Sequence, residues 1–98
     1  MPTYTPPLRD MQFVMHELLH VMDDLQQIPK HADLDADTVN AVLEEGGKFA
    51  AEVIFPLNVS GDAEGCSLDQ ASHAVTTPKG FKEAYRQYID GGWAALAC

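Results

Sequence analysis

The spacing of apolar residues constrains the fold of this chain more than any other feature, because apolar residues recur every three or four positions. In the first part of the chain they stand at Leu8, Met11, Met15, Leu18, Met22 and Leu25. This spacing places them on one face of an α-helix. Proline is tolerated in a first helical turn but not in a helix interior. Pro6 and Pro7 before the pattern and Pro29 after it therefore predict a helix over 8–26.

A second helix is predicted over 36–55. Asp35 is a suitable N-cap, and Pro56 marks the expected end. The apolar face comprises Val39, Val42, Leu43, Gly46, Phe49, Ala50, Val53 and Ile54. Gly46 and Gly47 each weaken a helix by about 1 kcal/mol relative to alanine. Close approach of a neighbouring helix is the expected compensation.

The stretch 57–77 lacks helical periodicity and is rich in turn-forming residues, so it is predicted to be irregular. The sequences "CSL" and "AVTT" could pair there as a short hairpin around "DQASH". A third helix is predicted over 79–90, beginning near Thr77-Pro78 and ending at the "DGG" that starts at Asp90. The predicted fold class is all-α, with three main helices and an irregular segment.

The composition narrows the classes of function. The chain has 98 residues, which suits one small domain, and a net charge of −9. Nucleic-acid binders and proteins of anionic membranes need a positive surface, so neither class is expected. No apolar run approaches the ~18 residues of a membrane span, and the N-terminus lacks a secretory pattern. A cytoplasmic protein with free thiols at Cys66 and Cys98 is expected.

The sequence "HELLH", residues 16–20, has the H-E-x-x-H pattern of zinc proteases. Two histidines at i and i+4 share one helix face and can bind one metal ion, while the glutamate between them activates water. His16 and His20 would be the ligands and Glu17 the general base of a zinc hydrolase, which is one alternative function.

Two observations weigh against that alternative. A catalytic zinc needs a third protein ligand, and Asp23, Asp24, His31 and His73 stand at no recognised spacing. On a helical projection, both histidines also fall nearly opposite the apolar stripe. The sequence therefore favours a solvated or interface-facing pair, and no metal site is predicted. No other catalytic pattern is present, since the glycines of "EEGGK" lie inside a helical pattern.

Over nearly its whole length the chain resembles the N-terminal part of acyl-CoA dehydrogenases, and it is most similar to the bacterial subfamily with an extended N-terminus. The stretches that carry the resemblance are "YTPPLRDMQFVMHELL" (4–19), "LDADTVNAVLEEGGKFAAEVIFPLN" (34–58), "SGDAEGCSL" (60–68) and "TPKGFKEAYRQYIDGGW" (77–93). The segments occur in the same order as in the family. This is a far more specific signal than one five-residue motif.

The resemblance implies an FAD-dependent enzyme that desaturates acyl-CoA thioesters between the α and β carbons. In the family, a glutamate removes the α proton, flavin accepts the β hydride, and electrons pass to electron-transferring flavoprotein. The family fold adds a middle β domain and a C-terminal helical bundle, and the enzymes assemble as dimers or tetramers. Residues 1–98 would be an incomplete N-terminal helical domain, because the family continues beyond "GGWAALAC".

No catalytic or cofactor-binding residue is carried over, since none of Glu17, Glu44, Glu45, Glu52, Glu64 and Glu83 matches the family's base. The chain alone is expected to be inactive, with FAD bound only by the intact enzyme. Tyr85, Tyr88 and Trp93 are the candidates for an interface with the remaining domains, against the simpler interpretation of core packing. A free-standing helical interaction module is the other alternative function.

Overall fold

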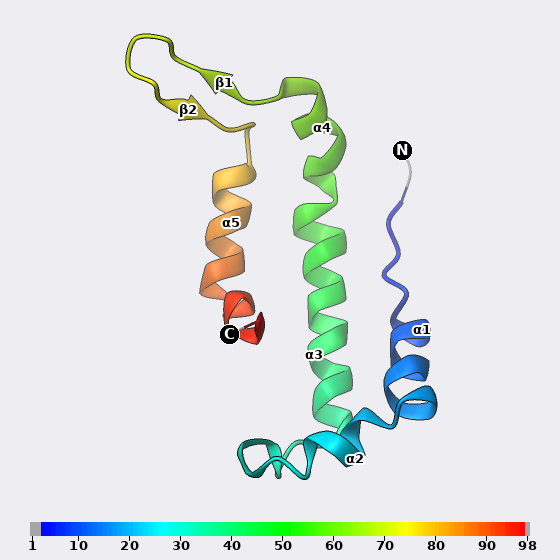
Figure 1. Ribbon diagram of the computed structural model, residues 1–98. Coiled ribbons are helices and arrows are strands. Elements are labelled where there is room, and N and C mark those ends of the chain that lie inside the picture. The colour runs from blue at the N-terminus through cyan, green and yellow to red at the C-terminus, as the bar shows by residue number, and fades with distance from the viewer. Residues whose placement is uncertain (1–2, 98) are drawn as a thin grey trace. The chain divides into compact units, whose positions relative to one another are not determined.

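The computed structural model describes residues 3–97 and is mostly helical, which confirms the all-α prediction (Figure 1). The chain divides into two compact units, with the boundary between Ala51 and Glu52. The prediction of one incomplete domain over 1–98 concerns a longer protein and stays a prediction. In residues 3–97, no helix has both the length and the apolar character needed to cross a membrane.

The first unit begins with a helix that is shorter and less regular than its apolar stripe predicts. Helix α1 spans Leu8–Gln12 and continues as the π-helical segment η1, Phe13–Leu18. His20 then adopts a left-handed conformation, with φ 51° and ψ 47°, before α2 resumes at Val21–Leu25. The expected single helix over 8–26 is therefore interrupted. A left-handed residue redirects the backbone and ends the helical hydrogen-bond ladder, whatever the side-chain pattern on either side.

The second predicted helix agrees closely with the structure. After the short 3-10 turn η2, Pro29–His31, helix α3 spans Ala36–Phe49 and runs into the π-helical segment η3, Ala50–Ile54. Asp35 caps α3 as expected, because its Oδ1 accepts a hydrogen bond from the Thr38 backbone N–H at 2.7 Å. The cap satisfies one of the donors that every helix leaves free at its N-terminus.

A glycine allows close packing inside the first unit, where α1 lies beside α3 (Figure 1). Gly47 is buried, and a Cβ added to it would lie 3.2 Å from Pro6 Cγ and 3.4 Å from Leu8 Cδ2. The absence of a side chain thus lets the segment before α1 rest directly on the α3 backbone. The close approach expected of a neighbouring helix thus occurs at Gly47, where Leu8 begins α1 and Pro6 precedes it.

The second unit contains a helix where the sequence pattern predicts irregular chain. Helix α4 spans Pro56–Glu64, so Pro56 begins a helix instead of ending one. Its missing N–H is harmless in a first turn, where that group has no intrahelical partner. The residues with no helical structure therefore begin at Gly65, whose φ of 68° ends α4. The predicted irregular segment is correct only beyond that point.

The predicted hairpin and the third predicted helix are both present in the second unit. Strands β1, Ser67–Leu68, and β2, Val75–Thr76, form an antiparallel hairpin, which confirms the pairing of "CSL" with "AVTT". Helix α5 spans Phe81–Asp90, and the 3-10 segment η4 spans Trp93–Ala97. Helix α5 starts two residues later than predicted, because Gly80 takes the N-cap position with φ 91°.

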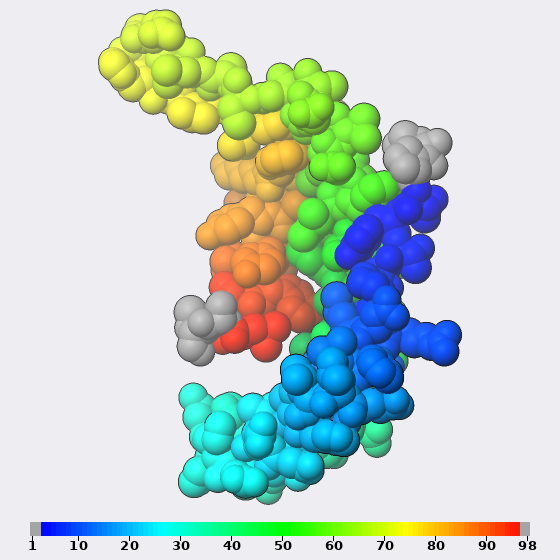
Figure 2. Space-filling model, turned by 45° about the vertical axis from the view of Figure 1, so that its right-hand side comes forward, coloured from blue at the N-terminus to red at the C-terminus, as the bar shows by residue number. Residues whose placement is uncertain are grey.

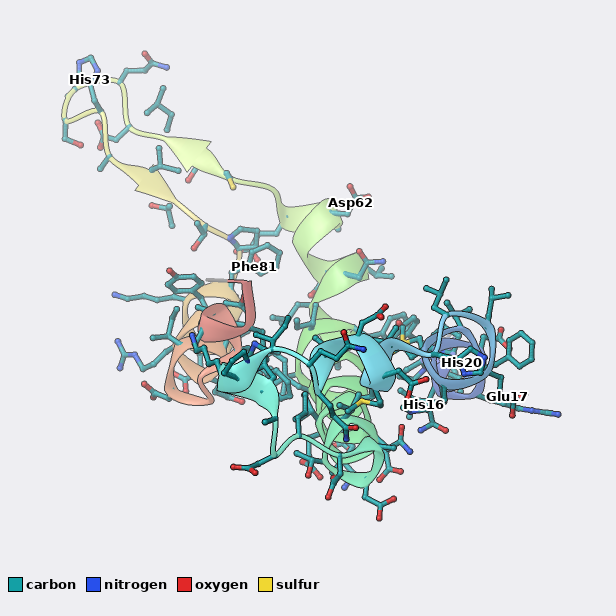
Figure 3. The ribbon with its side chains drawn as sticks, turned by 60° about the horizontal axis from the view of Figure 1, so that its bottom comes forward. His16, Glu17, His20, Asp62, His73 and Phe81 are labelled. Carbon is teal, nitrogen blue, oxygen red and sulfur yellow. The ribbon has the colours of Figure 1, made fainter. Side chains whose placement is uncertain are left out.

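Helices α4 and α5 meet at a second close glycine contact. Gly61 is buried, and a Cβ added to it would lie 2.5 Å from Phe81 Cε1 and Cζ. Figure 3 shows Phe81 turned toward the end of α4 that carries Asp62. Within the described residues, however, neither unit buries a hydrophobic side chain completely. The apolar side chains of both units are therefore only partly shielded from solvent.

The contact between Gly61 and Phe81 can be tested by substitution. Gly61→Ala should lower the stability of the second unit by roughly 1–3 kcal/mol, because the Phe81 ring must leave its position. Thermal unfolding of the 98-residue chain, followed by circular dichroism, measures the change. Ser60→Ala in the same helix is the control and should leave the midpoint nearly unchanged. Equal midpoints for the two variants would show that the ring does not lie on Gly61.

The Asp35 cap leads to a prediction about pH. The Thr38 side chain and backbone N–H both hydrogen-bond the carboxylate and lower the pKa of Asp35 below its usual value of 3.8. A group whose pKa falls on folding stabilises the folded state above its unfolded pKa, and this contribution is lost as pH falls through the folded value. An NMR titration of the Asp35 carboxyl should therefore have its midpoint below 3.8.

Asp35→Asn is the matched variant for this titration, because asparagine caps helices well but does not ionise. It should retain the helix and remove this part of the acid-induced loss of helicity. A titration midpoint of Asp35 in the unmodified chain at or above the usual aspartate value would contradict the capping geometry.

Candidate functional site

The HELLH sequence lies at the interruption between η1 and α2. His16 and Glu17 belong to η1, whereas His20 is the left-handed residue that follows it. The zinc motif requires both histidines on one regular helical turn. In this chain, the π-helical segment and the left-handed residue separate them, so the two imidazoles do not have the expected i, i+4 relation.

The His16 side chain is engaged within the first unit. Its Nε2 lies 2.7 Å from Asn40 Oδ1 of α3, and this carboxamide oxygen accepts a hydrogen bond from the ring N–H. The other ring nitrogen, Nδ1, is buried and has no hydrogen-bond partner among the described residues. His16 therefore faces α3 and is not available to an exposed metal ion.

The other two residues of the motif face elsewhere. Glu17 and His20 are both exposed, and Figure 3 shows Glu17 on the side of its helix away from α3. Among residues 3–97, no three histidine, cysteine, aspartate or glutamate side chains gather in a way that could hold a metal ion. The zinc-hydrolase alternative therefore lacks its geometry. His16 thus faces α3 of its own unit, whereas His20 lies at the surface.

The three aromatic candidates lie on or just after α5. The Tyr85 and Tyr88 rings stack, with centroids 6.4 Å apart and an interplanar angle of 30°. Tyr85 is 65% exposed and lies between Phe81 and Ile89, which are 38% and 44% exposed, at helical spacing. This face of α5 is therefore apolar and partly open to solvent, most of all at Tyr85. Such an arrangement is typical of interaction surfaces.

Trp93 follows α5 and packs against the end of that helix. Gly92 has a φ of 79°, which turns the chain back after the helix. A Cβ added at Gly91 would lie 2.9 Å from Trp93 Nε1, so the half-buried indole covers the backbone at that point. The structure thus brings Tyr85 and Tyr88 together and places Trp93 against the Gly91 backbone. Their assignment to a domain interface stays a proposal.

Two further exposed apolar side chains were not among the interface candidates chosen from the sequence. Leu68 and Val75 in the hairpin are 53% and 63% exposed and directly opposite each other. The predicted strand pairing could have pointed to them, because opposite residues of a hairpin share one face. The thiol of Cys66 beside them is free and exposed, as expected, whereas Cys98 lies outside the described residues.

Comparison with known proteins identifies relatives along nearly the whole chain. The 3-methylmercaptopropionyl-CoA dehydrogenase of Ruegeria pomeroyi is 37% identical over 95 residues, which are 97% of this chain and 16% of that protein. The broad-specificity linear acyl-CoA dehydrogenase of Mycobacterium tuberculosis is 29% identical over 95% of the chain. The butyryl-CoA dehydrogenase of Syntrophomonas wolfei is 31% identical over 91% of the chain. No family model matches the chain.

These relatives share one class, because all three are named as dehydrogenases of CoA thioesters and are thus oxidoreductases. The resemblance to the acyl-CoA dehydrogenase family is therefore confirmed, and the chain corresponds to one helical part of such enzymes. It spans only 15–16% of the length of the curated relatives that it matches. The match is consistent with an N-terminal part.

The left-handed conformation of His20 can be tested by comparing two substitutions. Glycine adopts this conformation freely, whereas other residues incur roughly 1–2 kcal/mol of strain. His20→Gly should therefore give a higher unfolding temperature than His20→Ala. In a continuous helix the order would be reversed, since glycine costs about 1 kcal/mol relative to alanine there. Thermal unfolding of both variants decides between an interrupted helix and the regular turn that a zinc motif needs.

Proposed function

We propose that the chain is the N-terminal helical part of an FAD-dependent acyl-CoA dehydrogenase. The intact enzyme introduces a double bond between the α and β carbons of acyl-CoA thioesters, and the 98-residue chain alone is inactive. One observation carries the proposal. Three dehydrogenases of CoA thioesters match 91–97% of this chain, and the match covers 15–16% of each of them.

The exposure of apolar side chains supports a role as part of a larger assembly. Burial of apolar surface is the dominant favourable term in folding. Within the described residues, no hydrophobic side chain is fully buried, and large ones such as Leu18, Leu19 and Tyr85 are about 60% exposed or more. The remaining domains of the enzyme would cover such surfaces. Tyr85, Tyr88 and Trp93 are proposed to lie at that interface.

The residues of this chain do not fit a flavin site. A dinucleotide pyrophosphate typically binds at a glycine-rich turn that leads into a helix N-terminus. The Gly46–Gly47 pair lies inside α3, where Gly47 is buried against Pro6. The chain's 15 acidic and 6 basic residues also make it a poor environment for a phosphate. We therefore assign flavin and the catalytic base to the rest of the enzyme.

The partners proposed for the intact enzyme follow from the same relationship. They are acyl-CoA as substrate, electron-transferring flavoprotein as electron acceptor, and further copies of the enzyme in a homo-oligomer. We propose the cytoplasm as its location. The contribution of the present chain is structural, since it would support the neighbouring flavin domain and wall the acyl-chain side of the pocket.

Comparison of the 98-residue chain with the protein encoded by its complete open reading frame tests the proposal. The complete protein should bind flavin stoichiometrically and reduce an electron acceptor in the presence of an acyl-CoA, whereas the 98-residue chain should do neither. The visible absorption spectrum and turnover measure both properties. Stoichiometric flavin and turnover in the 98-residue chain, or neither property in the complete protein, would sink the proposal.

Two variants of the complete protein extend this experiment to the interface. Tyr85→Ser should reduce the yield of flavin-loaded enzyme, because it removes an apolar contact from the open face of α5. Gln87→Ser on the same helix is the matched control and should not. Equal yields would place Tyr85 outside the interface without affecting the assignment of the enzyme.

A further inference from the structure

The hairpin of the second unit stands away from the helices that it connects. Every residue from 62 to 77 is exposed, and Figure 2 shows the hairpin projecting beyond α4 and α5. A two-stranded hairpin by itself is only marginally stable in water. An ordered but uncovered hairpin therefore needs a physical reason for its shape.

Local hydrogen bonds fix the tip of the hairpin. Asp69 Oδ1 accepts from the backbone N–H groups of Ala71 at 2.8 Å and Ser72 at 3.1 Å. The Asp69 backbone carbonyl accepts from His73 N–H at 2.8 Å, and Asp69 N–H donates to the Ala74 carbonyl at 2.9 Å. His73 lies at the tip with a φ of 62° (Figure 3). The turn is thus defined by its own residues.

The base of the hairpin is also held. The backbone N–H of Lys79 donates to Glu64 Oε2 at 2.8 Å, which joins the end of α4 to the chain before α5. Pro78 beside it is buried, as few of the described residues are. With both base and tip fixed, the hairpin presents a defined surface.

That surface is apolar on one face. Leu68 and Val75 are paired directly across the two strands, so their side chains lie together on the same face. Leu68 is 53% exposed and Val75 is 63% exposed. Ser67 and Thr76, the other pair, occupy the opposite and polar face. The hairpin therefore has one face suited to docking and one suited to water.

We propose that the hairpin docks through Leu68 and Val75 onto the part of the same dehydrogenase polypeptide that lies outside these 98 residues. The inference rests on the function proposed above. About five sixths of each relative lies outside the segment that this chain matches, and that segment includes the hairpin. The neighbouring parts of the polypeptide are thus the largest available source of an apolar covering surface.

Charge disfavours a second copy of the hairpin as the partner. Asp62, Glu64 and Asp69 lie in or beside it, and the sequence has no lysine or arginine between residues 62 and 78. Two hairpins packed face to face would bring these carboxylates together, and like charges in proximity are destabilising.

Cys66 is a natural probe of this docking, since its exposed thiol stands beside β1. The rate at which iodoacetamide labels Cys66 is measured by peptide mass spectrometry in the 98-residue chain and in the complete protein. The rate should fall roughly tenfold in the complete protein, because the docked hairpin must open before it reacts. Equal rates would overturn the inference, as would protection that disappears on dilution, which would indicate a second copy.

Two double variants of the complete protein distinguish the apolar face of the hairpin from its polar face. Leu68→Asp with Val75→Asp should restore fast labelling of Cys66, because it places charge on the docking face. Ser67→Asp with Thr76→Asp adds the same charge to the polar face and should leave the thiol protected. Equal labelling rates in the two double variants would overturn the inference.

Flavin content and turnover of the same preparations show which proposal has failed. A flavin-loaded, active enzyme with an unprotected Cys66 contradicts docking alone. A complete protein without flavin or turnover contradicts the proposed function, and the docking inference falls with it.

Discussion

Contacts between a side chain and a bare backbone are the constraint on which both units of this chain depend. In the first unit Pro6 rests on Gly47, and in the second the Phe81 ring rests on Gly61. The two glycines are buried, whereas no hydrophobic side chain of the described residues is. At both places the close approach requires that the residue has no side chain. Several large apolar side chains, such as Leu18 and Tyr85, stay exposed, which is typical of interaction surfaces.

Much of the fold could be predicted from apolar spacing and turn chemistry. Helix α3, its Asp35 cap and the hairpin pairing follow from local rules that the sequence displays directly. The interruption at His20 could not be predicted, because the apolar stripe continues across it and histidine enters the left-handed region at modest cost. Helix α4 was missed because Pro56 is equally compatible with the end of one helix and the first turn of the next.

At the candidate site, too, the sequence pattern predicts some features, whereas others depend on the three-dimensional arrangement. The HELLH sequence predicts two imidazoles on one helical face, but the bond from His16 to Asn40 depends on where α3 lies, 24 positions along the chain. No local pattern contains that information. The tyrosine pair was easier to anticipate, since helical spacing brings Tyr85 and Tyr88 onto neighbouring positions of α5. The similarity of the whole chain to acyl-CoA dehydrogenases identifies the family and concerns neither pair of residues individually.

The hydrogen bonds around Asp69 have a consequence for the assembly of a larger protein. Since the turn is fixed by its own carboxylate and backbone groups, its conformational entropy is lost when the hairpin folds and not when it meets a partner. Ordering costs at the moment of association are a major reason why flexible segments bind weakly. A prefolded arm avoids that penalty, so the proposed contact through Leu68 and Val75 would lose less free energy to ordering than the same contact made by a flexible loop.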